Sequence, residues 1–185
     1  GDGVSNIDEL NSETDPYTDD YGPVITLSDT SVTIDAVALR TELPSNLASA
    51  IDGLDGTVAV SHDLASELLA PGLYTINWTA TDQAGNSSTA AQTLNVRPLA
   101  NWQVDQSSGE GNTITVALYL NGKSPEYPVV ANFTVSGSAN NPSDHNASSG
   151  TLTITEGLRS AVINVDVVSD QISENDETIV FTLDS

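Results

Sequence analysis

The chain has 185 residues, enough for two β-sandwich modules of about 80 to 90 residues each. It carries 26 acidic and 4 basic residues, and the resulting net charge of −22 excludes a nucleic acid or an anionic membrane as the default partner. The lack of cysteine excludes a disulfide framework and a thiolate metal site. The sequence also has no run of about 18 apolar residues, so direct membrane insertion is not predicted.

The excess of carboxylates points to a cation. In a compact fold these groups repel one another unless counter-ions bind, and hard divalent cations prefer oxygen ligands. A small domain without disulfides also needs another source of stability, which is often a metal. Ca²⁺ is therefore the predicted cofactor.

The composition favours strands over helices. Thr, Ser, Val, Asn and Gly are frequent and helix formers are scarce. We expect an all-β chain of tandem immunoglobulin-like antiparallel β-sandwiches, preceded by a short acidic calcium-loop segment.

Residues 1–21 contain half of a calcium-binding loop. In the EF-hand pattern an oxygen ligand precedes a turn glycine and a bidentate glutamate follows. Asp2, the Val4 carbonyl and Glu9 fit the fifth, seventh and twelfth loop positions, with Gly3 at the turn. The earlier ligands would precede Gly1, so we expect the chain to begin within a repeat.

This segment resembles the thrombospondin type 3 repeats of secreted proteins, and Thr14-Asp15-Pro16 is a typical continuation. The resemblance implies calcium binding by a partial repeat. An acidic, solvated linker has the same composition. Asp19 and Asp20 can also cap the end of the next module.

Residues 22–98 form the first predicted sandwich. Alternating apolar and polar residues predict strands at 24–27, 32–35, 58–60, 73–80 and 92–96. The leucine-rich stretch from Leu39 to Leu69 predicts a short helical turn. Trp78 is expected in the core.

The segments 50–58, 72–75 and 80–87 resemble HYR-type and related bacterial immunoglobulin-like domains, most clearly in Ala80-Thr81-Asp82-Gln83-Ala84-Gly85-Asn86. That family implies a spacer or adhesion module and no catalysis. Asp52, Asp55 and Asp82 fit an ion site near a module junction. They also fit Asx turns, in which a carboxylate accepts hydrogen bonds from nearby backbone N–H groups, and we favour the turns.

Residues 99–185 form the second predicted sandwich, after a linker at 97–100. Its expected strands are 113–120, 129–135, 150–154, 161–167 and 178–183. Three features resemble the Calx-beta domain: Gly109-Glu110-Gly111 before a long strand, Asp144 ahead of a short strand, and the acidic run 170–177 before Phe181.

This resemblance implies calcium at one end of the sandwich. The implied ligands are the carboxylates of Glu110, Asp144, Asp170, Glu174 and Glu177 and the Ile172 carbonyl. Ser169 stands where the family often has Asp, so we expect fewer ions or weaker binding. The resemblance implies a closing strand after Leu183 that this sequence does not include, so we expect either that the sequence stops short of it or that the module has an open sheet edge.

The same acids have a physical interpretation without the family. Carboxylates that converge from separate loops repel one another unless a cation neutralises them. Solvated loop decoration is the alternative, because Asp and Glu are usually exposed.

No catalytic motif is expected. Ser143-Asp144-His145 has the residue types of a hydrolase triad, but triads are assembled from separated positions. A zinc site has few nitrogen ligands available, since the chain has only two histidines. The prediction is that the chain is not an enzyme.

The predicted function is that of calcium-binding structural and adhesive modules in a larger extracellular or cell-surface protein. The expected partners are calcium and the neighbouring modules of the same polypeptide, with other cell-surface proteins or polysaccharide beyond them. The alternative is a non-catalytic accessory segment of a secreted hydrolase or protease. In that alternative, polysaccharide binds to exposed aromatics, for which Trp102, Tyr119 and Tyr127 are the candidates.

Overall fold

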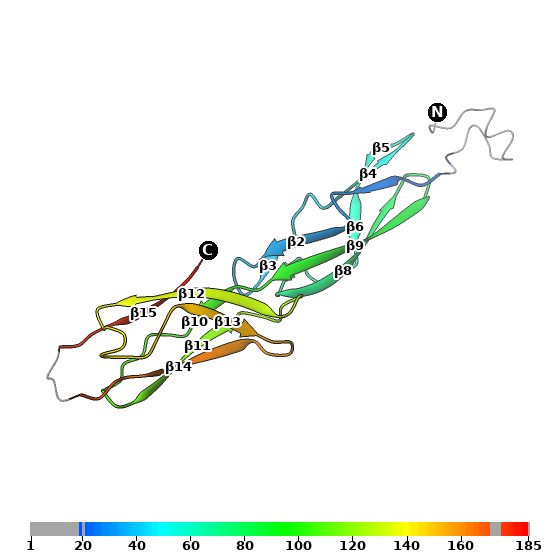
Figure 1. Ribbon diagram of the computed structural model, residues 1–185. Helices are drawn as coiled ribbons and strands as arrows, with labels where there is room; N and C mark the ends of the chain where they lie inside the picture. Colours follow the sequence, from blue (N-terminus) through cyan, green and yellow to red (C-terminus); the bar gives the residue numbers. More distant parts are fainter. Residues whose placement is uncertain (1–18, 20, 171–174, 185) are drawn as a thin grey trace. The chain divides into compact units, whose positions relative to one another are not determined.

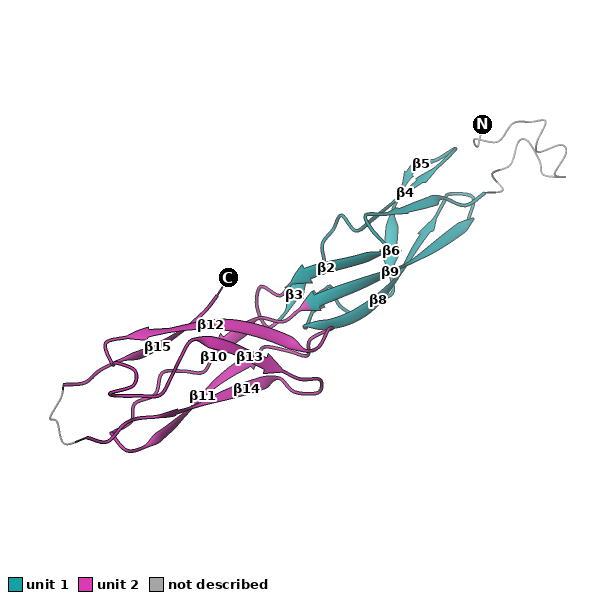
Figure 2. Cartoon of the chain, viewed as in Figure 1, with its two compact units in different colours: residues 1–35, 40–96 teal, residues 36–39, 97–185 magenta. Residues whose placement is uncertain are grey.

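The computed structural model of the chain describes residues 19, 21–170 and 175–184, and these residues are all-β (Figure 1). The chain divides into two compact units, which are coloured separately in Figure 2. The first unit ends at Val96, and the second begins at Arg97 and includes the short segment 36–39. In the described part of the chain no helix is long and apolar enough to cross a membrane.

The first unit consists of short antiparallel sheets in a sandwich-like arrangement. A four-stranded sheet has the order β2-β9-β8-β6, a three-stranded sheet has the order β1-β4-β5, and β3 pairs with β7. Its strands are β1 (Val24–Leu27), β2 (Ser31–Asp35), β3 (Thr41–Glu42), β4 (Ala48–Asp52), β5 (Gly56–Val58), β6 (Val60–His62), β7 (Leu68–Leu69), β8 (Gly72–Thr81) and β9 (Ser87–Arg97).

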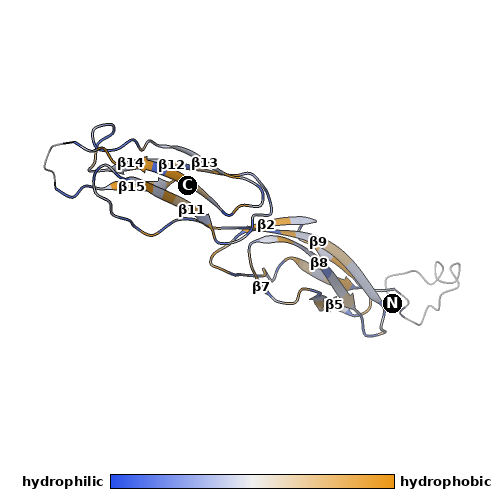
Figure 3. Cartoon of the chain, turned by 90° about the horizontal axis from the view of Figure 1, so that it is seen from below, coloured by the Kyte–Doolittle hydropathy of each residue, from blue (hydrophilic) through white to orange (hydrophobic). Residues whose placement is uncertain are grey.

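The long hairpin of β8 and β9 supplies much of the first core. Its strands pair in register from Gly72 with Val96 to Thr81 with Ser87. Period-two alternation turns one face inward and buries Ile76, Leu94 and Trp78, as predicted for the tryptophan. Burial of each large apolar side chain contributes about 1.5 to 3 kcal/mol. In Figure 3 the orange, hydrophobic segments lie mainly on the strands, and many of the connecting loops are blue.

The predicted helical turn between Leu39 and Leu69 is wrong. This stretch contains β3 to β7, and no helix is assigned to it. Leu47 and Leu69 are buried, whereas Leu54 and Leu68 are more than half exposed, so the leucines do not form one helical face.

The second unit contains two three-stranded antiparallel sheets. Their orders are β10-β11-β14 and β13-β12-β15. The strands are β10 (Ala100–Trp102), β11 (Thr113–Leu120), β12 (Val129–Gly137), β13 (Gly150–Ile154), β14 (Ser160–Asp166) and β15 (Ile179–Leu183).

Aromatic residues fill part of the second core. The Trp102 ring packs edge-to-face on Phe133 at a centroid distance of 5.7 Å and contacts Phe181 at 5.5 Å. Tyr127 packs against the core cluster around Leu118. The prediction of an exposed aromatic platform for polysaccharide is therefore wrong for Trp102 and Tyr127, because their rings contribute to the core.

Candidate metal centres

One end of the second unit gathers the loops that the Calx-beta resemblance singled out. The Gly111 N–H donates to the Val167 carbonyl at 3.0 Å, which ties the Glu110 loop to the end of β14. The next residue along, Val168, donates its N–H to the Asp144 carbonyl at 2.9 Å. Three segments that are distant in sequence therefore lie side by side at this end.

A further segment joins them just before β15. The Ala139 N–H donates to the Thr178 carbonyl at 3.1 Å, and the Thr178 N–H donates to the Ser138 hydroxyl at 2.9 Å. Asp144 lies a few residues after Ala139, and Glu177 immediately precedes Thr178. These backbone hydrogen bonds bring the segments that carry Asp144 and Glu177 close together.

The Asp144 carboxylate is held by its own loop. Its Oδ2 accepts the Asn140 backbone N–H at 2.6 Å. This bond and one from the Ser143 hydroxyl hold the pKa of Asp144 below its usual value. Asp144 is half-buried and remains ionised, as a metal ligand must.

The Glu177 side chain also acts on Asp144 and contributes to lowering the pKa of its carboxyl group. Two acids on neighbouring segments repel when both are ionised, and a shared proton or a cation between them relieves the repulsion. The pairing of the segments that carry these acids is a feature that solvated loop decoration does not require.

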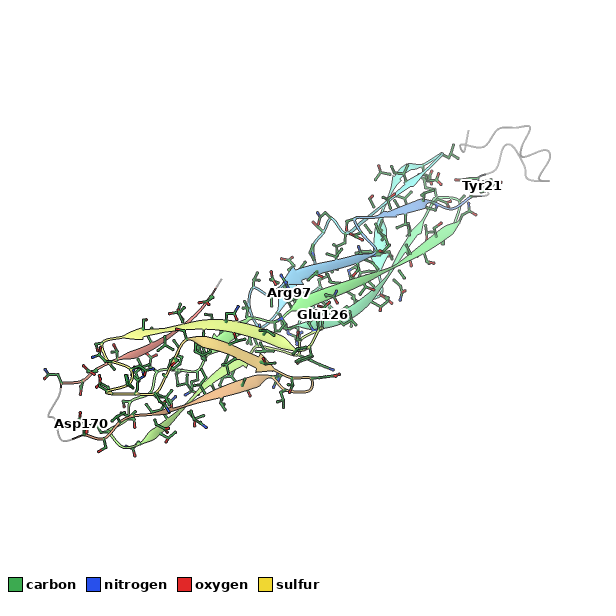
Figure 4. All side chains as sticks on the ribbon, viewed as in Figure 1. Tyr21, Arg97, Glu126 and Asp170 are labelled. Atoms are coloured by element: carbon green, nitrogen blue, oxygen red, sulfur yellow. The ribbon has the colours of Figure 1, made fainter. Side chains whose placement is uncertain are left out.

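The other predicted ligands of this end have mixed placements. Glu110 and Asp170 are exposed, and Asp170 lies at the loop end of the unit just beyond β14 (Figure 4). Among the residues that the structure describes, neither forms a group of three carboxylates with Asp144 and Glu177 within metal-binding range. The remaining predicted ligands, Asp2, Val4, Glu9, Ile172 and Glu174, lie outside the described residues. This ligand set stays a prediction.

The first unit confirms the predicted Asx turns at Asp52 and Asp82 but shows none at Asp55 within its described residues. Asp52 Oδ1 accepts the backbone N–H groups of Leu54 and Asp55 at 2.7 and 2.9 Å. Asp82 Oδ1 accepts those of Gly85 and Asn86, both at 2.7 Å. These bonds close the turns that follow β4 and β8.

The Asp55 carboxylate links the two turns. Its Oδ2 accepts the Gln83 backbone N–H at 2.7 Å, although the two residues lie 28 positions apart. The turns after β4 and β8 are therefore neighbours at one end of the first unit.

These turns also bring acids together. One carboxylate oxygen from each of Asp19, Asp52 and Asp82 lies within 4.8 Å of the other two. The sequence indicated each aspartate separately but gave no reason to connect Asp19 with the turns. The link arises only in the folded chain, where Asn86 Nδ2 donates to the Asp19 carbonyl at 2.7 Å although the residues are 67 positions apart.

Comparison with known families supports the interpretation of the second unit. A model of the Calx-beta domain matches residues 96–185. That family is a calcium-binding type of module, non-catalytic in itself and found within larger proteins. The resemblance stated for the second sandwich is confirmed, whereas those to HYR-type domains and thrombospondin type 3 repeats stay predictions. No curated protein matches the chain.

Proposed function

We propose that the chain is a calcium-dependent structural and adhesive segment of a larger protein outside the cell or at its surface. The pairing of the Asp144 loop with the segment before β15 that holds Glu177, within the stretch similar to the Calx-beta domain, carries this proposal. It supports an ion-stabilised loop end, and nothing in the described loops supports a reaction on a substrate.

Residues of the second unit would hold the ion at its loop end. Asp144 and Glu177 are the central ligands, because hydrogen bonds of Thr178 with Ser138 and Ala139 pair the segments that carry them. Glu110 and Asp170 lie on the adjoining loops and are the next candidates, with Ile172 and Glu174 predicted from sequence. A bound Ca²⁺ would place a positive charge among these carboxylates.

The ion's role would be mechanical. The loops at this end are joined by pairs of backbone hydrogen bonds, such as those from Gly111 to Val167 and from Val167 to Asn112. A cation shared by several loops would cross-link them and stiffen the module. Extracellular calcium modules bind with dissociation constants of about 10⁻⁴ to 10⁻³ M, which suits a chain of net charge −22 in a calcium-rich medium.

Thermal unfolding with calcium and with chelator tests the proposal. At calcium concentrations about 100 times the dissociation constant, binding stabilises the folded state by about 2.7 kcal/mol. For a module of this size we expect chelation to lower the Tm by about 5 °C or more.

Two variants locate the effect. Asp144→Asn and Glu177→Gln should each reduce the calcium-induced rise in Tm. Glu126→Gln is the matched control, because Glu126 is exposed and lies at the other end of the second unit from Asp170 (Figure 4). An equal Tm of the second unit in calcium and in chelator, or a calcium response of the second unit's own unfolding transition that survives both variants, would overturn the proposal.

A further inference from the structure

The three aspartates of the first unit come from separate parts of the chain. Asp19 precedes β1, Asp52 ends β4, and Asp82 follows β8. Their ligand oxygens lie within 4.8 Å of one another. Asp52 and Asp82 are only 6% and 7% exposed, so water screens their charges poorly.

The surroundings of Asp19 are acidic. Burial is the main cause of its raised pKa, and the charges of Asp52, Asp82 and Asp55 act in the same direction. The charges that act on it within the described chain are thus all negative, and no basic side chain is among them. The arrangement lacks a positive charge.

A second observation is independent of the clustering. The Oδ2 atom of Asp19 has less than 1 Å² of exposed surface and no hydrogen-bond donor. A buried acceptor without a partner is costly, typically by about 1 to 3 kcal/mol and more for a charged group. This oxygen needs a donor or a cation, and the described residues supply neither.

The Asx turns leave room for such a cation. The turn N–H groups bind Oδ1 of Asp52 and Oδ1 of Asp82, and Asn86 Nδ2 also donates to Oδ2 of Asp82 at 3.0 Å, so both carboxylates are fixed in orientation. The Oδ2 atom of each carboxylate has a further lone pair for an ion. The turns and an ion site are therefore compatible, and the turns position the ligands.

We infer that Asp19, Asp52 and Asp82 form a calcium site of the first unit, separate from the loop end of the second unit. An all-carboxylate donor set selects a hard cation. Calcium tolerates irregular geometry with about six to eight oxygen ligands, whereas magnesium demands a near-octahedral shell. Water completes the shell.

The site fastens the chain where it enters the first unit. Asp19 lies ahead of β1, and Asn86 of the β8–β9 turn donates to its main-chain oxygen. The ion would join residue 19 to the turns after β4 and β8. Calcium therefore orders the start of this unit as well as neutralising it.

The test is a calcium titration of the whole chain, followed by the backbone amide resonances in NMR. We expect the amides of Leu54, Asp55, Gly85 and Asn86 to shift on calcium addition. Asp19→Asn should raise the calcium concentration for half-saturation at these amides by about tenfold or more. This variant keeps the fold intact, because Asn86 binds the main-chain oxygen of Asp19.

The controls separate this site from that of the second unit. Asp144→Asn should leave these shifts unchanged, whatever becomes of the second unit's own calcium response. Glu42→Gln removes one charge from an exposed position of the first unit and should also have little effect. The inference fails if the four amides do not respond at about 10 mM calcium, or if Glu42→Gln weakens binding as much as Asp19→Asn does.

Discussion

The indole N–H of Trp78 donates to the side-chain carbonyl of Gln92 at 3.0 Å, and both residues are buried between the sheets of the first unit. Gln92 in turn donates its amide to the main-chain oxygen of Asp29 at 2.6 Å. One glutamine therefore satisfies an indole from β8 and the carbonyl that precedes β2. A buried polar bridge of this kind is stabilising only while every member has a partner.

Replacement of Gln92 by leucine should destabilise the first unit by about 2 to 4 kcal/mol, because the Trp78 N–H and the Asp29 carbonyl both lose their partner. Urea unfolding followed by tryptophan fluorescence measures this loss. Gln106→Leu is the control, since Gln106 is exposed and its bond to the Thr115 carbonyl is replaceable by water. A loss below about 0.5 kcal/mol for Gln92→Leu, the range of ordinary surface changes, would show that the bridge contributes little.

Gly137 should not tolerate alanine. It has φ +139°, and an added Cβ would collide with the main-chain oxygen of Thr178 on the neighbouring strand segment. We expect Gly137→Ala to cost about 3 kcal/mol or more, by forcing β12 away from β15. Gly157→Ala measures the cost of the positive φ alone, because Gly157 has φ +83° and nothing lies within 4 Å of an added Cβ.

The glycine pair is compared by chemical denaturation in chelator. The strain at Gly157 alone should cost about 1 to 2 kcal/mol. Equal losses for the two variants would mean that the contact with Thr178 relaxes freely.

Asp63 should make the first unit acid-sensitive. The Asn77 backbone N–H at 2.9 Å and its side-chain amide at 2.6 Å hold the pKa of Asp63 below its usual value. An aspartate with a lowered folded-state pKa stabilises the protein above its unfolded-state pKa of about 4, and that contribution is lost as the pH falls through the folded-state pKa.

The stability difference between the parent chain and Asp63→Asn should therefore be largest near neutral pH and shrink below about pH 4. Unfolding free energies of both proteins in chelator, measured across this range, give the difference. Glu42→Gln accounts for the loss of one charge from an exposed site. If the difference grew on acidification, the assigned direction of the pKa shift would be wrong.

Strand positions followed from local sequence wherever one face of a strand is buried. The predicted strands 24–27, 113–120 and 150–154 coincide with β1, β11 and β13, because alternation fixes which side chains face the core. The prediction of a helical turn between Leu39 and Leu69 failed because the strands of this segment are short and several of its leucines are exposed. Hydropathy alone does not report which of them face solvent.

The two candidate sites differ in how far the sequence revealed them. Asp144 and Glu177 were indicated by a family pattern, and the structure adds the backbone pairing of the segments that carry them. The turns of Asp52 and Asp82 were indicated by local chemistry. Their proximity to Asp19 depends on long-range strand pairing, which no local pattern encodes.

The pairing of β2 with β9 has a kinetic consequence. Roughly 60 residues separate these neighbours in the four-stranded sheet, whereas β8 and β9 are joined by a tight turn. The hairpin can form as soon as its own residues are available, but β2 must wait for it. Closing so large a loop is entropically slow, so this unit should fold on a timescale of about milliseconds to seconds, with the early-synthesised β2 unpaired until the ribosome has passed Arg97.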